Sequence, residues 1–106
     1  MKLIEQCISD AVFNSKKFSG GNTVVLVDDD KIECILHGHK IFSLTRDSNS
    51  FEWNDCGWQT RTTASRLNAC FNAVSKLTGT CYHYNFGRGE VIDSNGKLVF
   101  KTSNLK

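Results

Sequence analysis

Apolar and polar positions along the chain alternate with two kinds of pattern, one typical of helices and one typical of extended strands. Residues 2–16 place apolar side chains at positions 3, 4, 7, 8, 11 and 12, which form one continuous stripe at helical spacing. The same spacing returns at about 63–78, and its apolar members share one face: Leu67, Cys70, Phe71, Val74 and Leu77. These patterns predict an N-terminal helix and a central helix.

Short runs rich in β-branched and aromatic residues predict the strands. They lie at 23–27, 32–37, 41–46 and 51–54 before the central helix, and at 80–86, 90–93 and 97–101 after it. Only tight turns separate the first four, so these should pair as an antiparallel meander. We expect an α+β fold over residues 1–106, an antiparallel β-sheet meander with the N-terminal and central helices packed on one face.

The central helix has recognisable ends. Thr62 or Thr63 can cap its start, because a threonine hydroxyl accepts from the free amides of the first turn. Gly79 lies where a left-handed residue ends a helix. The face opposite the apolar stripe, expected to point outward, carries small or polar residues: Ser65, Asn68, Ala69, Asn72, Ala73, Ser75 and Lys76.

Charge is distributed unevenly along the chain. Residues 1–55 carry six basic and nine acidic side chains, whereas residues 56–89 carry four basic side chains and no acidic one. Hydroxyl groups and arginines surround the start of the central helix, where free amides and the helix dipole favour an anion. The expected DNA-binding residues are Thr60, Arg61, Thr62, Thr63, Ser65, Arg66, Asn68, Asn72, Lys76 and Arg88.

Within this set, asparagine can bond bidentately to an adenine edge in the major groove, which makes Asn68 and Asn72 candidates for base contacts. Arginine, lysine and hydroxyl groups commonly contact sugar and phosphate. The alternative is a purely structural helix start, with threonine caps, Cys56 and Trp58 in the core and solvated arginines.

Other chemistry is less well supported by the sequence. His37, His39, Cys81 and His83 could be assembled into a metal site, but their spacings match no recognised zinc pattern. A Cys–His nucleophile from Cys56 or Cys81, or a divalent ion at Asp28–Asp30 with Glu33, is also conceivable. We expect no metal, no cofactor, no small-molecule substrate and no enzymatic activity.

Cysteine usage bears on the compartment. Five cysteines without a CxxC motif or a signal peptide favour a reducing, cytoplasmic location. We expect Cys7, Cys34, Cys70 and Cys81 to act mainly as small buried hydrophobes. No stretch approaches the roughly 20 apolar residues that span a bilayer, so no membrane partner is expected.

Three segments carry a resemblance to a known family: "NTVV" at 22–25, "LHGHKI" at 36–41 and "CGWQTRTTASRLNA" at 56–69. They resemble a family of small phage proteins whose shared pattern includes C-G-W-x-T-x-T-T-x-S-R-L-N. The match covers roughly residues 22–72. More narrowly, the chain is similar to a domesticated DNA-binding domain of a phage homing endonuclease, kept by a phage satellite as a repressor of the phage capsid operon.

The narrower resemblance implies sequence-specific binding of double-stranded DNA without nuclease activity. It assigns the motif residues Thr60, Arg61, Thr62, Thr63, Ser65, Arg66 and Asn68 to the DNA site. One helix gives a small footprint, so a homodimer on a palindromic site is expected. The alternative function is a small phage-type protein that binds and inhibits a protein partner.

Overall fold

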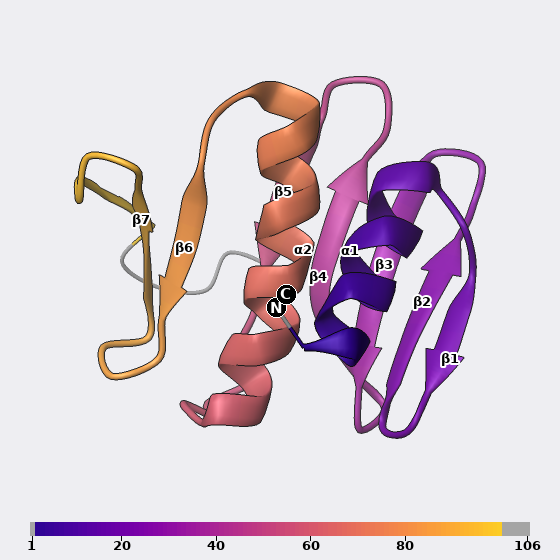
Figure 1. Cartoon of the computed structure of the whole chain (residues 1–106), viewed down its shortest axis with the longest axis horizontal. Helices are drawn as coiled ribbons and strands as arrows, with labels where there is room; N and C mark the ends of the chain where they lie inside the picture. Colours follow the sequence, from indigo (N-terminus) through magenta and orange to yellow (C-terminus); the bar gives the residue numbers. More distant parts are fainter. Residues whose placement is uncertain (1, 101–106) are drawn as a thin grey trace.

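The computed structural model describes residues 2–100 of the chain (Figure 1). Helix α1 (Leu3–Asn14) comes first and helix α2 (Arg61–Thr78) lies after the fifth strand. The strands before α2 are β1 (Phe18–Gly20), β2 (Thr23–Val27), β3 (Lys31–Leu36), β4 (His39–Thr45) and β5 (Ser50–Trp53). Those after it are β6 (Tyr82–Asn85), β7 (Glu90–Asp93) and β8 (Leu98–Phe100).

The strands form two antiparallel sheets. The expectation that all strands belong to a single sheet is therefore wrong. Strands β1 to β5 form a five-stranded meander in sequence order, and β6 to β8 form a separate three-stranded one. The α+β class and the meander pairing are confirmed. Helix α2 separates the two groups in sequence, and the last three strands pair with one another beside it rather than with β5.

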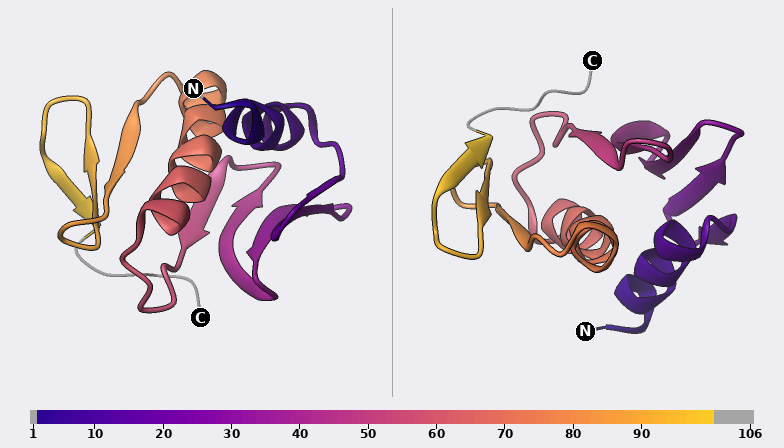
Figure 2. Two further views of the ribbon diagram at one scale, coloured as in Figure 1. Left: turned by 60° about the horizontal axis from the view of Figure 1, so that its bottom comes forward. Right: turned by 90° about the horizontal axis from the view of Figure 1, so that it is seen from above.

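Both helices pack on one face of the five-stranded sheet, as predicted. In the views of Figure 2, α2 lies in the middle of the molecule, with α1 on one flank and β6 on the other. Helix α1 contacts β1 and β2, and α2 contacts β3 and β4. This arrangement leaves α2 with neighbours on three sides and exposes mainly its two ends.

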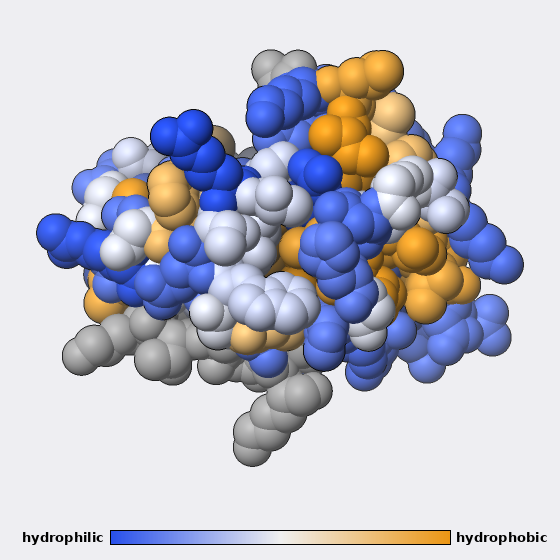
Figure 3. Space-filling model, turned by 90° about the horizontal axis from the view of Figure 1, so that it is seen from below, coloured by the Kyte–Doolittle hydropathy of each residue, from blue (hydrophilic) through white to orange (hydrophobic). Residues whose placement is uncertain are grey.

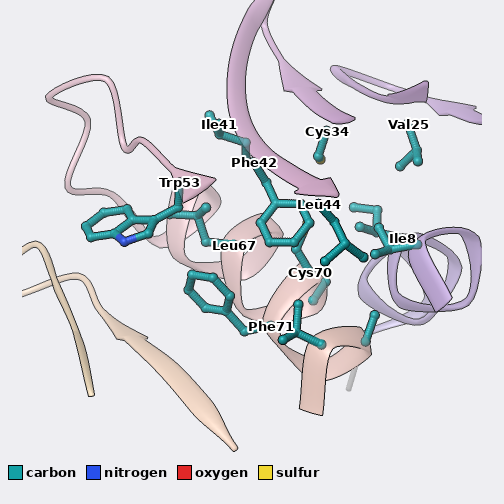
Figure 4. Packing of buried hydrophobic residues seen from close by; sticks show 14 of the residues in the cluster. Ile8, Val25, Cys34, Ile41, Phe42, Leu44, Trp53, Leu67, Cys70 and Phe71 are labelled. Atoms are coloured by element: carbon teal, nitrogen blue, oxygen red, sulfur yellow. The ribbon is translucent and has the colours of Figure 1, made fainter. Parts of the chain in front are cut away.

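One hydrophobic core joins the helices to both sheets. Phe42 points from β4 toward Leu67 and Phe71 on α2 (Figure 4), and all three side chains are fully buried. Two aromatic contacts extend the core into the second sheet. One joins Trp53 to Tyr84, with ring centroids 5.5 Å apart. The other joins the half-buried rings of Phe51 and Tyr82 at 5.0 Å. Rings at these separations stabilise packing beyond the area that they bury.

Helix α2 begins two residues earlier than the sequence pattern indicates. Its N-cap is Thr60, whose hydroxyl accepts from the Thr63 backbone N–H at 3.2 Å, so the expected caps Thr62 and Thr63 are wrong. The pattern missed this because the first helical residues, Arg61 and Thr62, are exposed and carry no apolar signal. Gly79 ends the helix with φ +80°, as predicted.

The small residues of α2 do not face solvent, which corrects the expected outward face. Ala69 and Ala73 are 1% and 0% exposed, on a helix packed between α1 and β6. Small side chains let two helices approach closely, and the burial of Ser9 and Ala11 on α1 is consistent with such packing. The absence of charged residues on this part of α2 therefore reflects helix packing.

Two further expectations differ from the structure. Residues 18–20 form an edge strand, and no strand was predicted there. Cys34 and Cys70 are buried as expected, but Cys7 is only partly buried and Cys81 is exposed. A three-residue strand that ends in Gly20 and is followed by Gly21 has too little periodic signal to stand out from a turn.

Candidate functional site

Four connecting segments gather at one end of the molecule, at the bottom of Figure 1. They are the β1–β2 turn (21–22), the β3–β4 turn (37–38), the segment 54–62, which leads into α2 and includes its first two residues, and the β6–β7 turn (86–89). We call this surface the loop end. Figure 3 looks onto it and shows a largely hydrophilic surface broken by small apolar patches.

Two tight turns shape the loop end, and both require left-handed backbone. His37 and Gly38 have φ of +51° and +78° and join β3 to β4 as a two-residue hairpin loop. Cys56 and Gly57 repeat this with φ of +56° and +78°, and the Trp58 N–H donates to the Asp55 carbonyl across them at 2.8 Å. Positive φ at both central residues is the pattern of a type I′ turn, which accounts for the glycine in each motif.

The second turn holds Trp58 against the first. The indole meets the His39 ring at 4.9 Å and the His37 ring at 6.2 Å between centroids, both edge to face. Trp58 is 36% exposed, so the expectation that it lies in the core under the structural alternative is wrong. A bulky aromatic side chain is thereby fixed at the surface by two imidazoles.

A buried carboxylate, that of Asp55, fixes the segment before α2 to the second sheet. Asp55 is 7% exposed, accepts from the Gly57 N–H at 3.0 Å and accepts from the Tyr84 hydroxyl at 2.8 Å. Burial, and then the bond to Asp55, raise the pKa of the Tyr84 hydroxyl well above its usual range. Gly89 packs so closely here, with φ +66°, that a Cβ would lie 2.3 Å from Gln59 Nε2. The β6–β7 turn is therefore fastened to the segment before α2.

A chain of polar contacts links α1 and α2 to the turns. Arg66 donates from Nε to Thr23 Oγ1 at 3.0 Å and from a terminal nitrogen to Ser65 Oγ at 2.8 Å. Ser65 in turn donates to a carboxylate oxygen of Glu5, which lowers the pKa of that carboxyl. Thr23 donates to Asn22 Oδ1 at 2.9 Å. Arg66 thus serves mainly to join α2 to β2.

The outer end of this chain reaches the hairpin turn. The Asn22 side-chain amide lies 3.3 Å from His37 Nε2, and His37 contacts Trp58 as described above. Side chains from six different segments are therefore connected through direct contacts. The geometry of the exposed groups at the loop end is set by this framework and does not depend on any single turn.

The structure divides the predicted site residues into two groups. Three of them are exposed at the start of α2, namely Thr60, Arg61 and Thr62, and Arg88 is exposed on the neighbouring β6–β7 turn. Arg88 has a weak ion pair with Glu90 at 3.9 Å. By contrast, Thr63 is 1% exposed, and Ser65 and Arg66 are half-buried in the polar chain.

The two asparagines proposed for base contacts make bonds inside the molecule. Asn68 accepts from the Tyr84 N–H at 2.7 Å and donates to the Tyr84 carbonyl at 3.2 Å, which attaches α2 to β6. Asn72 accepts from the Ser9 hydroxyl at 2.8 Å, which attaches α2 to α1. Asn68 therefore uses both groups that would bond to a base, and Asn72 uses its side-chain oxygen.

Lys76 lies at the other end of α2. At a rise of about 1.5 Å per residue, it is about 22 Å along the helix from Arg61. Its ammonium lies 5.9 Å from the centre of the Phe13 ring, at the outer limit of a cation–π contact. The structure therefore does not bring Lys76 together with the other exposed cations of the set.

Two hollows flank the first turn of α2. One, of about 250 Å³, is lined by Leu36, His37, Trp58, Thr60, Thr62 and Thr63. The other is about 320 Å³ and has more charge around it, with Lys2, Glu5, Arg61 and His83 in its lining together with Phe86 and Tyr84. Thr62 faces the first hollow and Arg61 the second, so the first turn of α2 is a ridge between them.

Metal and thiol chemistry find little support in this geometry. Within residues 2–100, no three His, Cys, Asp or Glu side chains come together as metal ligands would. Burial, and then the Asp55 carboxylate, raise the pKa of the Cys56 thiol, which is the opposite of what an activated nucleophile requires. Over the same residues, neither helix has the length and apolar character to cross a membrane.

Comparison with known proteins places the chain in a family. The family described as Kyanoviridae Gp96 protein matches residues 1–104. The chain belongs to this family. The Kyanoviridae Gp96 family is a phage protein family, so the phage origin expected from the three motif segments is confirmed. No curated protein and no solved structure matches the chain.

Several contributors to the loop end are not among the DNA-binding residues expected from the sequence. Trp58, His37, Asp55, Lys2 and Phe86 come from separate segments and meet only in the fold. A local signal existed for Asp55, because an acidic residue directly before a Cys-Gly turn can accept from the turn's own amides. For the others, the pairing of β3 with β4 and the place of β6 had to be known.

Proposed function

We propose that this member of the Kyanoviridae Gp96 family binds double-stranded DNA through the loop end. The observation that carries the proposal is the charge of that surface. Within the four segments of the loop end, the exposed charged side chains are those of Arg61 and Arg88. The same segments contain one carboxylate, that of Asp55, which is buried and hydrogen-bonded. Exposed arginines next to threonine hydroxyls are the usual contacts to a phosphate backbone.

The proposal differs from the expectation in how the helix meets the duplex. The side of α2 packs on its neighbours, so contact is made by its first turn, with Arg61 and Thr62 foremost and Trp58 and Arg88 beside them. Asn68 and Asn72 support the fold in this proposal. Sequence-specific repression, as the resemblance implies, then requires base contacts from the exposed residues of the loop end and two copies of the chain on one site.

The proposed setting is the cytoplasm of the phage-infected cell, and the proposed role is transcriptional repression without strand cleavage. Five free cysteines accord with a reducing compartment. The two exposed arginines predict that log K falls with log salt with a slope of about −1.8 per chain, and about −3.6 for a dimer.

The test is a salt titration of binding to labelled random-sequence duplexes, followed by sequencing of the bound fraction. The variant Arg61→Ala/Arg88→Ala should bind more weakly and lower the slope by about 1.8 per chain. The matched control is Lys16→Ala/Lys17→Ala, which removes the same charge from exposed positions outside the loop end and should leave the slope nearly unchanged. A flat slope for the unmodified protein, or equal losses in both variants, would overturn the proposal.

A second candidate is binding to a protein, and exposed aromatic side chains favour it. Trp58 is 36% and Phe86 42% exposed, and each lines one of the hollows beside Arg61. Tryptophan and arginine are enriched at the centres of protein interfaces. A complex with a host or phage protein that resists high salt and is lost in Trp58→Ala, with no DNA binding, would favour this function.

A further inference from the structure

The smaller hollow beside α2 has a lining that differs from the rest of the loop end. Leu36, 1% exposed, forms an apolar wall, and the Trp58 indole and His37 imidazole contribute aromatic rings. Thr60 and Thr62 contribute hydroxyl groups from the start of α2. None of the lining residues carries a formal charge with histidine neutral. The chemistry suits an uncharged, planar ligand with polar edges more than a phosphate.

Of the threonine hydroxyls that line the hollow, two are paired with each other and one is available among the described residues. Thr60 Oγ1 donates to Thr63 Oγ1 and accepts from the Thr63 N–H, both at 3.2 Å, so this pair is committed to the helix cap. The Thr62 hydroxyl makes no hydrogen bond among the described residues, and the side chain is exposed. A hydroxyl can donate or accept, so Thr62 can meet either kind of group on a ligand edge.

Trp58 is held in place before any ligand arrives. The two edge-to-face contacts with His37 and His39 restrict its ring, and the type I′ turn fixes its backbone. A fixed aromatic surface loses little conformational freedom when a second ring stacks on it. Base–aromatic stacking is a main source of affinity where proteins bind unpaired nucleotides.

We propose that this hollow takes a single unpaired or everted nucleobase, stacked on Trp58 and hydrogen-bonded to Thr62. The inference rests on the proposed DNA binding, because Arg61 and Arg88 would hold the backbone beside the base. It goes beyond that function in predicting that the chain prefers a duplex in which one base is already free. Opening a paired base costs energy, and an unpaired one avoids this cost.

The experiment compares two labelled duplexes that differ only in one unpaired central base, by anisotropy and by tryptophan emission. The duplex with the free base should bind about tenfold more tightly and quench indole emission. Trp53 is fully buried in the core, so the quenching should be lost in Trp58→Phe. The variant Thr62→Leu, which adds bulk and removes the hydroxyl, should reduce the ratio of the two affinities from about tenfold to near one.

Two controls separate the hollow from its surroundings. Phe86→Ala alters an exposed aromatic ring at the other hollow and should keep the preference. Thr80→Leu makes the same change at an exposed threonine beyond the far end of α2 and should also keep it. Loss of the preference in either control would overturn the assignment to this hollow.

The outcomes distinguish the two proposals. Equal binding of both duplexes, with the expected salt slope, would overturn the nucleobase site and leave DNA binding intact. Binding only to the duplex with the free base, with quenching, would support the site and overturn general duplex binding. No binding to either duplex would overturn both.

Discussion

The two ends of the molecule are built from similar turns but are held together differently. At the end opposite the loop end, which we call the turn end, lie residues 28–30, 46–49 and 94–96. Most of its side-chain hydrogen bonds stay local. The Asp29 N–H donates to Asp28 Oδ1, Ser48 bonds Ser50, and Asp93 accepts from the amides of the β7–β8 turn.

One contact at the turn end is an exception, since Arg46 donates to the Asp28 carbonyl at 3.1 Å in the neighbouring turn. At the loop end such contacts are the rule. Asn22 reaches His37, His39 meets Trp58, and Asp55 bonds Tyr84, each across two segments far apart in the sequence. The burial of acidic side chains differs between the two ends in the same way. The three aspartates of residues 28–30 are all exposed at the turn end, whereas Asp55 is buried at the loop end.

The turn end is therefore a solvated surface, whereas the loop end is preorganised. Exposed charges on self-contained turns keep a small protein soluble and contribute little to stability. Turns connected through buried and half-buried side chains fix the positions of the groups they expose, which is what a binding surface requires.

The Asp55→Ala substitution should lower the free energy of unfolding by about 3 kcal/mol, measured by urea denaturation. It removes the acceptor of the buried Tyr84 hydroxyl and of the Gly57 amide, and unpaired buried donors are costly. The matched change at the turn end, Asp28→Ala, removes the exposed carboxylate that accepts from the Asp29 N–H and should shift stability by less than about 0.5 kcal/mol. Comparable losses at the two ends would contradict the contrast.

The Asn68→Ala substitution should cost about 2 kcal/mol, because both of its hydrogen bonds to the Tyr84 backbone are lost. Asn72→Ala removes one bond, to Ser9, and should cost about 1 kcal/mol. Neither variant, once folded, should change the sequences selected from random duplexes. A changed sequence preference in Asn68→Ala with full stability would return this residue to the DNA contact.

Alkaline pH should weaken the loop end through Tyr84. Its pKa is raised in the folded protein above the ordinary value of 10, so above pH 10 the unfolded chain loses a proton that the folded one retains. Stability should therefore fall as the pH rises past 10, and Tyr84→Phe should show a shallower fall. Denaturation midpoints between pH 8 and 11 measure this, and parallel curves for the two proteins would count against it.

The smallest effect is expected at Glu5 under acid conditions. The hydrogen bond from Ser65 lowers the pKa of Glu5 in the folded protein. Its contribution is thus complete above the unfolded pKa of about 4.5 and is lost as the pH falls through the folded value. Because Glu5 is partly exposed, this should amount to less than about 1 kcal/mol. Wild-type stability should fall more steeply than that of Glu5→Gln below pH 4.5.

Much of the fold could be predicted from the chain alone. The strand at 23–27 and the strand at 90–93 have the predicted bounds, and both helices lie where their apolar spacing places them. These elements carry their signal locally, in side-chain periods of about two or about 3.6 residues. The division into two sheets could not be predicted, because the partner of each strand depends on the place of α2 between them.

The candidate site shows where local signals stop. The chain alone predicts the two helices, the antiparallel pairing of the first strands and the stretch without acidic residues before and within α2. Which polar side chains of that stretch are exposed depends on the contacts between elements far apart in the sequence. Asn68 and Arg61 are both polar residues of one helix, yet Asn68 bonds β6 and Arg61 faces solvent. The physical reason is that each side of a helix becomes buried or exposed only when the neighbouring elements have packed against it.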